Sequence, residues 1–380
     1  MTLARTASRV PAGSASLWPV ERLGIVGLPN SGKTSLFNAL TGAAAPVAPH
    51  PFTTTESSVG SAPLPDARLD ALAAMSSSRR VVHATVELVD IAGLVAGASS
   101  GEGLGNRFLA GIREVDALCL VLRAFEDEQV PGETDPLEAL SVLELELVLA
   151  DLASLESQLD RRRKASRVAK GDRGAAELLS GMEAAHAELS AGIPLYRSTL
   201  PAEVRSRLAE LFLLTNRPVV AVVNMGEDQL EAPDKVLDPV TGALGDHGDV
   251  LGVCIQLEAE AARLDAKERL ELLDGLGLGE GALPRVARAA YHVIGRRTFF
   301  TTGDKESRAW SFRAGASAPE CAGVIHSDLQ RGFIRAEVIA TEALLELGSW
   351  SAAKAAGRIR LEGKDYQVAD GDVLEIRFNV

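Results

Sequence analysis

The chain has 380 residues, 46% of them hydrophobic and 24% charged, which is enough for two or three globular domains. A net charge of −13 argues against broad nonspecific binding to nucleic acid. No apolar run approaches the ~18 residues that a membrane span requires, so no membrane partner is expected. The three cysteines are too few and too scattered for a disulfide framework or a metal site, which indicates a reducing cytoplasm.

Residues 1–20 contain Arg5 and Arg9, several Ala and Ser residues, and no acidic residue. This composition predicts a disordered extension, or a start site placed too early. A transit peptide is the alternative interpretation, although two arginines support it only weakly.

The first expected strand, Leu23–Val26, leads into the segment Gly27–Thr34, which fits the pattern GxxxxGK[ST], and a helix is expected over Ser35–Leu40. In such a loop the backbone amides and the helix N-terminus converge on phosphates. Lys33 would reach the β- and γ-phosphates of a nucleotide, and the Thr34 hydroxyl would bind Mg²⁺. The predicted nucleotide-binding residues here are Gly27, Asn30, Ser31, Gly32, Lys33, Thr34 and Ser35.

A second expected strand, Val86–Val89, ends in a DxxG segment that runs from Asp90 to Gly93. After a phosphate-binding loop, this motif places Asp90 on Mg²⁺ through water and the Gly93 amide near the γ-phosphate. The segment from Pro51 to Thr54 lies between the two motifs, where a switch loop is expected, and one of its threonines could complete the Mg²⁺ shell.

Two apolar runs, Ala117–Leu122 and Pro218–Val223, predict fully buried parallel strands. Asn224-Met225-Gly226-Glu227 follows the second run, at the position where GTPases carry Asn-Lys-x-Asp. Met225 replaces the lysine and the longer Glu227 replaces the aspartate, so the contact that selects guanine is broken. A buried donor–acceptor mismatch costs about 1–3 kcal/mol, enough to reverse base preference. We therefore predict that Asn224, Met225 and Glu227 bind ATP, and a degenerate site that still binds guanine remains open.

Strands that alternate with helices imply an open α/β sheet with ligands at the carboxyl ends of the strands. Between the third and fourth strands, helical spacing over Leu137–Arg163 and Ala175–Ala191 predicts an inserted α-helical hairpin. Arg161–Lys164 would lie at its tip, either as a solvated helix end or as a surface that faces RNA.

From Thr298 onward, short β-like segments separated by turns predict a compact, mostly β domain. The expected strands are Ala309–Phe312, Asp365–Val368 and Val373–Arg377.

Taken together, these motifs resemble the YchF family, the Obg-like ATPases. The resemblance covers about residues 22–380. It is carried by Gly27–Leu40, Asp90–Val95, Gly101–Asn106, the Asn-x-x-Glu of residues 224–227, and in the C-terminal part Gly323–His326, Gly332–Ala336 and Gly363–Tyr366.

The resemblance implies an Obg-type G domain over residues 21–297 with a helical insertion at 134–200, and a TGS domain of β-grasp type over residues 298–380. It implies Mg²⁺ as cofactor, ATP as substrate, GTP as a further nucleotide, and a ribosome or ribosomal subunit as partner, with possible RNA contact through the insertion and the TGS domain. By the family pattern, Thr54 is the switch threonine, so the implied metal ligands are Thr34, Thr54 and Asp90, and the implied catalytic residues are Lys33, Thr54 and Gly93.

Three positions depart from the family pattern. Leu120 occupies the position of the family's proposed catalytic His, His50 replaces an aromatic residue, and Ser57 replaces a proline. Leu94 stands where many GTPases carry a catalytic Gln, as is usual for this family. We therefore expect slow hydrolysis, and a nucleotide-dependent binding module with negligible turnover is the alternative.

Overall fold

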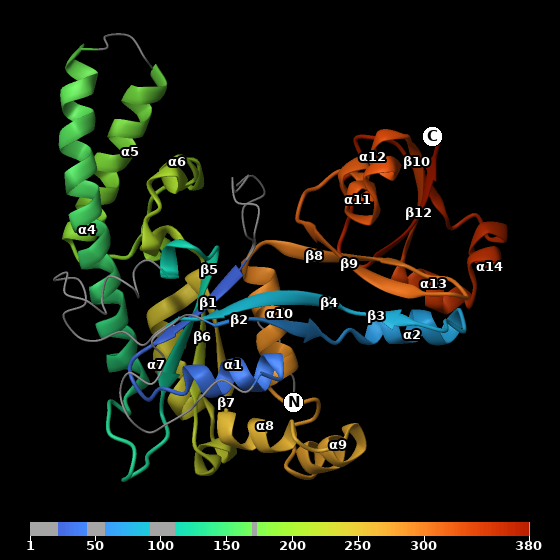
Figure 1. Cartoon of the computed structure of the whole chain (residues 1–380), viewed down its shortest axis with the longest axis horizontal. Helices are drawn as coiled ribbons and strands as arrows, with labels where there is room; N and C mark the ends of the chain where they lie inside the picture. The colour runs from blue at the N-terminus through green and yellow to red at the C-terminus, as the bar shows by residue number, and fades with distance from the viewer. Residues whose placement is uncertain (1–21, 44–57, 92–110, 169–172, 380) are drawn as a thin grey trace. The chain divides into compact units, whose positions relative to one another are not determined.

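The computed structural model describes residues 22–43, 58–91, 111–168 and 173–379. The chain divides into two compact units (Figure 1). The first contains the chain up to Ala62 together with Glu87–Ile294, and the second contains Pro63–Val86 together with Gly295–Val380. The segment Pro63–Val86, which lies inside the 21–297 range expected for the G domain, thus makes its contacts with the C-terminal part.

The first unit is built on a six-stranded sheet with the order β2-β4-β1-β5-β6-β7. β1 pairs in parallel with β4 and β5, and the parallel pairing continues from β5 through β6 to β7. The predicted open α/β sheet is therefore confirmed. Its strands are β1 (Arg22–Gly27), β2 (Ser58–Leu64), β4 (Ala84–Asp90), β5 (Ala117–Arg123), β6 (Val219–Asn224) and β7 (Gly248–Val253).

Every residue of β5 and β6 is buried, as the two apolar runs predict for central parallel strands. α4 and α7 pack on one face of the sheet. α1 contacts β1, and α10 contacts β5, β6 and β7. No helix among the described residues is both long and apolar enough to cross a membrane. The helices of this unit are α1 (Lys33–Thr41), α4 (Pro136–Val168), α5 (Arg173–Ser190), α6 (Ala202–Arg207), α7 (Asp234–Leu244), α8 (Ile255–Ala261), α9 (Ala266–Gly275) and α10 (Leu283–Val293).

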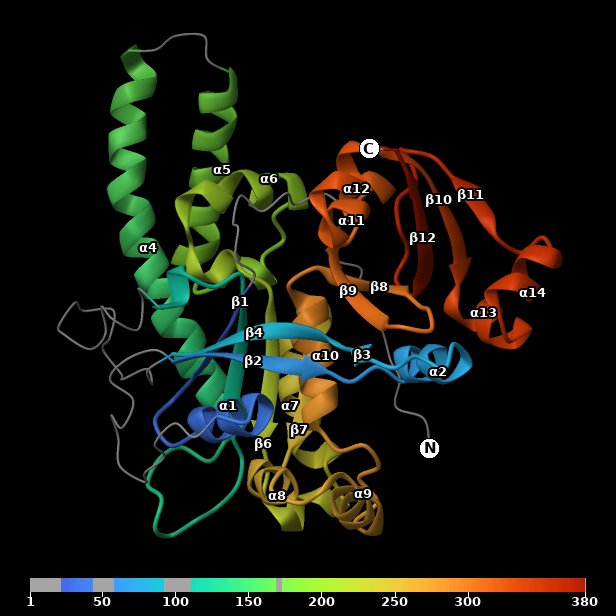
Figure 2. The ribbon, with the colours of Figure 1, turned by 45° about the vertical axis from the view of Figure 1, so that its right-hand side comes forward.

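The predicted helical hairpin is confirmed as α4 and α5, which lie side by side in both views (Figures 1 and 2). Their shared core contains Val148 and leucines of α4 together with Met182, Ala185 and leucines of α5, because apolar residues recur at helical spacing on both helices, and residues 195–213 add further leucines to it. The hairpin therefore has a hydrophobic core of its own beside the one that α4 shares with the sheet.

The second unit contains a six-stranded sheet with the order β11-β10-β12-β8-β9-β3. Its core is formed by Phe299, Phe312 and Phe333 with smaller apolar residues from α11, β10 and β12. The strands are β3 (Val81–Val82), β8 (Arg296–Thr301), β9 (Ser307–Arg313), β10 (Phe333–Ala340), β11 (Arg360–Glu362) and β12 (Asp372–Phe378), and the helices are α2 (Ala67–Met75), α11 (Ala318–Ile325), α12 (Ser327–Arg331), α13 (Thr341–Leu347) and α14 (Trp350–Ala355).

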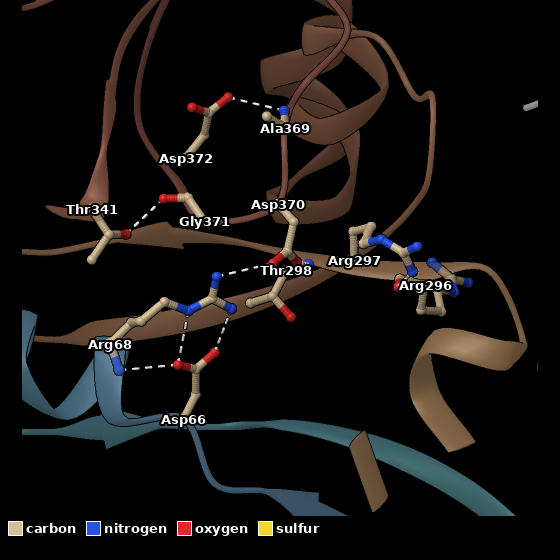
Figure 3. Close-up of polar contacts among 10 residues, drawn as sticks. All are labelled: Asp66, Arg68, Arg296, Arg297, Thr298, Thr341, Ala369, Asp370, Gly371 and Asp372. Atoms are coloured by element: carbon tan, nitrogen blue, oxygen red, sulfur yellow. Dashed lines mark hydrogen bonds and ion pairs between the residues drawn. The ribbon is translucent and has the colours of Figure 1, made fainter. Parts of the chain in front are cut away.

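Arg68 attaches α2 to the C-terminal part of this unit (Figure 3). Its guanidinium donates to Asp66 at 2.8 Å and 3.0 Å and to Asp370 at 2.9 Å, and lies over the Phe300 ring at 5.2 Å from the centroid. Asp370 in turn accepts from the Thr298 backbone N–H at 2.8 Å. These contacts explain why Pro63–Val86 belongs to the second unit.

One expected strand is wrong. Ala309–Phe312 and Val373–Arg377 lie in β9 and β12, but Asp365–Val368 contains only an isolated bridge between Gln367 and Ser317. The strand lies earlier, at β11, because the chain turns after Glu362 and the Tyr366 N–H donates back to the Gly363 carbonyl at 3.4 Å. Alternation of apolar residues alone does not reveal such a turn.

Candidate nucleotide-binding site

The glycines of the predicted phosphate loop are required by close packing where β1 passes into α1. A Cβ atom on Gly27 would lie 2.5 Å from the Val121 carbonyl oxygen, and one on Gly32 would lie 2.5 Å from the Asn224 side-chain nitrogen. Gly32 (φ 97°) and Asn30 (φ 60°) adopt left-handed backbone conformations, which glycine and asparagine tolerate best. The loop conformation is thus specified by residue types that the sequence motif fixes.

Lys33 is buried at the first position of α1, and its ammonium group donates to the Leu28 carbonyl at 2.8 Å. Burial lowers the pKa of Lys33 to about 8, while the negative charge of Asp90 opposes that shift. The ammonium therefore lies inside the curve of the loop, where a phosphate would replace the carbonyl as its partner. Ser35, in the first turn of α1, is partly exposed.

Thr34 and Asp90 meet at the carboxyl ends of β1 and β4. The Thr34 hydroxyl donates to Asp90 Oδ2 at 2.7 Å, and Asp90 is fully buried. Asp90 Oδ1 and the Ser31 hydroxyl oxygen are buried and have no hydrogen-bond partner among the described residues. Burial raises the pKa of Asp90, and the Thr34 hydrogen bond and the Lys33 charge oppose that rise.

This pair of side chains fits a magnesium ion. Mg²⁺ takes oxygen ligands, keeps several waters, and is usually held by one or two protein oxygens together with substrate phosphates. A carboxylate oxygen without a partner beside a threonine hydroxyl is such a ligand set. No cluster of three or more His, Cys, Asp or Glu residues that could hold a metal ion is found in the described ranges.

The base segment, Asn224–Glu227, follows β6 at the same edge of the sheet. The Asn224 side chain donates to the Ser31 carbonyl at 3.1 Å and accepts from the Ile255 N–H at 3.3 Å, so it joins the phosphate loop to the start of α8. Met225 is buried, and its methyl group packs against Gly252. Glu227 is exposed and begins the short 3-10 helix that follows the segment.

Several predicted residues lie outside the described ranges. Thr54 and Gly93, together with Leu94, His50 and Ser57, fall in residues 44–57 and 92–110. Their proposed roles in switching and hydrolysis therefore stay predictions.

Leu120 belongs to the hydrophobic core. It has 0% exposure in the middle of β5 and packs in the cluster that joins the sheet to α4 and α7. Alternate residues of a strand face the same side, and Leu118 and Leu122 belong to that cluster too. The position that resembles the family's catalytic His therefore carries a core side chain here.

Two residues at this edge were missed by the sequence analysis. Arg123, the last residue of β5, is 2% exposed and pairs in register with Asn224. Gln229 accepts from the Gly226 N–H at 2.9 Å and donates to the Ala124 carbonyl at 3.0 Å. A charged residue directly after a buried apolar run was the available signal for Arg123, whereas no sequence pattern marks Gln229.

Comparisons with known proteins cover both parts of the chain. Residues 22–150 match a family model described as 50S ribosome-binding GTPase, and residues 297–379 match the model YchF-GTPase_C, described as a protein of unknown function. The chain is 44% identical over 366 residues to the ribosome-binding ATPase YchF of Bacillus subtilis, covering 94% of this chain and 99% of that protein. It is 46% identical over 363 residues to the protein of the same name from Haemophilus influenzae, with the same coverage.

The chain belongs to the YchF family. A solved YchF structure, that of the Schizosaccharomyces pombe YchF GTPase, superposes with a TM-score of 0.80 at 29% identity and covers 94% of this chain and 97% of that one. A GTP-binding protein from Pyrococcus horikoshii, at 18% identity and a TM-score of 0.59, shares the fold. The YchF fold thus extends over both units, and the P-loop nucleotide site lies in the first.

Proposed function

We propose that this chain is a ribosome-associated ATPase that binds ATP with Mg²⁺, hydrolyses it slowly and acts as a switch on a ribosomal partner in the cytoplasm. The observation that carries the proposal is the combination of Lys33, Thr34 and the incompletely bonded Asp90 at one edge of the sheet. Relatives at 44–46% identity over 94% of the chain, named ribosome-binding ATPases, support the choice of nucleotide and partner.

ATP is favoured over GTP because of the base segment. Asn224 is committed to the Ser31 carbonyl and the Ile255 N–H, and Met225 packs in the core. Glu227 is then the base-contact candidate, and its side chain is one methylene longer than the aspartate that accepts from guanine. A buried mismatch of donor and acceptor costs about 1–3 kcal/mol, which is sufficient to reverse the preference.

In the proposed metal site, Thr34 and Asp90 would hold Mg²⁺ together with the nucleotide phosphates, and Thr54 of the switch segment would supply a further ligand. When bound, the ion neutralises charge on the β- and γ-phosphates. Lys33 would supply a second positive charge, and Gly93 would offer a backbone amide to the γ-phosphate. Neither Leu94 nor Leu120 can orient a water molecule because both side chains are apolar, which is the reason for proposing a slow rate.

Partner binding is proposed to use the α4–α5 hairpin and the C-terminal segment from residue 298, with contact to RNA. At the hairpin, Arg162 pairs with Glu210 at 2.7 Å and Arg163 with Glu183 at 3.0 Å. Exposed ion pairs of this kind are worth about 0–1 kcal/mol, so RNA phosphates can compete for these arginines.

Titration calorimetry with ATP, GTP and their non-hydrolysable analogues tests the nucleotide. ATP should bind at least as tightly as GTP, and Glu227→Asp should shift the preference toward GTP. Met225 is left unchanged in this test because it is buried, and a lysine there would place a charge in the core. A wild type that prefers GTP by tenfold or more, about 1.4 kcal/mol, would contradict the ATPase proposal and favour the GTPase that the Schizosaccharomyces pombe relative's name suggests.

Co-sedimentation tests the partner. Binding to ribosomes should depend on nucleotide and weaken with salt, and deleting residues 298–380 should reduce it. Absence of binding under every nucleotide at low salt would refute the partner. A single-turnover assay then separates slow hydrolysis from a binding module with negligible turnover.

A further inference from the structure

Arg123 is a buried cation at the ligand-binding edge of the sheet that the proposed function does not use. It is 2% exposed, and no carboxylate of a described residue lies within ion-pairing distance of its guanidinium. Burial lowers the pKa of Arg123, and nearby Asp127 opposes that shift. A buried charge without a salt bridge is costly unless its hydrogen bonds are well placed.

The hydrogen bonds of Arg123 all go to the loop that follows it. The guanidinium donates from Nε to the Phe125 carbonyl at 3.0 Å and from Nη1 to the Val130 carbonyl at 2.9 Å. It also lies over the Phe125 ring at 4.3 Å from the centroid. A single planar side chain thus fixes two points of the loop five residues apart from two nitrogens held in a rigid plane, whereas a lysine would have to reach both carbonyls from one nitrogen.

One end of this loop, residues 124–132, is attached to the base segment. The backbone N–H groups of Ala124 and Phe125 donate to the Asn224 carbonyl at 2.8 Å and 3.2 Å. A Cβ atom on Gly226 would touch the Phe125 Cβ at 3.7 Å, so the loop packs against the segment that precedes Glu227.

The other end is attached to the phosphate loop. Asn30 donates from its side chain to the Pro131 carbonyl at 2.9 Å. Gly132, with φ 137°, lies where an added Cβ would be 3.5 Å from Arg123 Nη1 and 3.6 Å from the Pro29 carbonyl. The loop therefore connects the two halves of the nucleotide site.

We propose that Arg123 is a positioning residue of the nucleotide site, which holds the 124–132 loop as a brace between the base segment and the phosphate loop. The proposal rests on the proposed ATPase function. It deepens that function by naming what sets the distance between the bound base and the bound phosphates. ATP binding depends on the base and the phosphates fitting their two half-sites at the same time. A loosened brace therefore weakens ATP binding more than it slows the chemical step.

The test uses Arg123→Lys in the full-length protein, with Arg217→Lys as matched control. Arg217 is also buried, and it too donates to backbone carbonyls, of Val115 and of Arg113, but it precedes β6 at the opposite edge of the sheet. Arg123→Lys should raise KM for ATP about tenfold, equal to about 1.4 kcal/mol, with kcat within about twofold of wild type. Arg217→Lys should lower the unfolding temperature and leave KM unchanged.

Asn30→Gly releases the loop from its other end and tolerates the left-handed backbone at that position. If the loop acts as one brace, the double variant of Asn30→Gly and Arg123→Lys should raise KM no more than the worse single variant. Should Arg123→Lys fail to fold, Phe125→Leu, which removes the ring under the Arg123 guanidinium, must raise KM at unchanged kcat.

Three results would overturn the proposal. One is a KM for Arg123→Lys within twofold of wild type, another is an equal rise in KM for Arg217→Lys, and the third is additivity in the double variant. A wild-type protein that fails to bind ATP would instead refute the proposed function, so the two failures are distinguishable.

Discussion

Asp90 and Asp151 are two buried carboxylates of the first unit whose surroundings differ. Asp90 is 0% exposed, its Oδ2 accepts from the Thr34 hydroxyl at 2.7 Å, and its Oδ1 has no partner among the described residues. Asp151, on α4, is 1% exposed and accepts from the Leu214 N–H, the Thr215 N–H and the Thr215 hydroxyl, each at 2.7 Å. Burial raises the pKa of both carboxyl groups, to about 6 for Asp151.

The difference separates a structural carboxylate from one placed for a ligand. Asp151 has its hydrogen bonds completed by the chain itself, as buried polar groups require. Asp90 leaves one oxygen open beside Thr34 and Lys33, and the Ser31 hydroxyl at the same edge is also unpaired among the described residues. Buried atoms without a partner also occur elsewhere in the described residues, so what distinguishes this edge is that the open carboxylate oxygen of Asp90 lies beside Thr34 and Lys33, where phosphate and Mg²⁺ are expected.

The largest effect should come from Lys33→Ala. Losing charge-assisted contacts to two phosphates, each worth about 1.5–3 kcal/mol, should lower ATP affinity about 100-fold or more in calorimetric titration. The fold should persist by circular dichroism. Lys235→Ala, at an exposed position of α7, is the control and should bind normally. Unchanged ATP affinity after Lys33→Ala would mean that the edge of the sheet beside Asp90 does not bind phosphate.

Asp90→Asn and Asp151→Asn test the comparison directly. Asp90→Asn should abolish the tightening of ATP binding by Mg²⁺ without lowering stability, because the substitution removes a buried charge that the chain does not fully bond. Asp151→Asn should lower the free energy of unfolding by about 1–3 kcal/mol, since it leaves a buried donor unpaired, and should leave ATP affinity unchanged. Urea denaturation measures the free energy of unfolding, and titration with and without Mg²⁺ measures ATP affinity. A loss of stability in Asp90→Asn together with a loss of Mg²⁺-dependent affinity in Asp151→Asn would contradict the comparison.

Leu120→His tests whether a side chain in the middle of β5 reaches the bound nucleotide. The side chain is fully buried in the apolar cluster, so we expect a loss of about 2–3 kcal/mol in unfolding free energy and no gain in kcat. Leu118→His, on the same face of the strand, is the control and should behave alike. A higher kcat in Leu120→His alone, at near-normal stability, would show that position 120 reaches the bound nucleotide.

A smaller effect is expected from pH. The pKa of Lys33 is about 8 in the free protein because burial disfavours its charged form, and bound phosphate favours that form. Below pH 8 the ammonium is already protonated, whereas above pH 8 binding must take up a proton, so ATP affinity should fall by up to about tenfold per pH unit. Calorimetry between pH 7.5 and 9.5 measures the slope. Lys33→Arg should abolish it because the guanidinium stays charged, and a flat wild-type profile would contradict the shift.

Much of the fold was predictable because its signals are local. β5 and β6 are continuous apolar runs, and α4 and α5 show helical spacing over many residues, so length and period identify them. The strand expected over Asp365–Val368 was misplaced because the turn after Glu362, which the Tyr366 N–H to Gly363 carbonyl bond supports, carries no strong pattern. The extent of a short strand depends on its partner strand as much as on its own residues.

The sequence by itself determined the phosphate loop, Asp90 and the change from Asn-Lys-x-Asp to Asn-Met-Gly-Glu, because each depends on residue types at fixed spacing along one segment. Only the tertiary structure decided that Leu120 faces the α4 and α7 layer, that Arg68 joins Pro63–Val86 to residue 370, and that Arg123 braces a loop against Asn30. These contacts join residues that no periodicity links. They depend on which strand lies beside which, and burial and hydrogen bonding set that order only when the whole chain is packed.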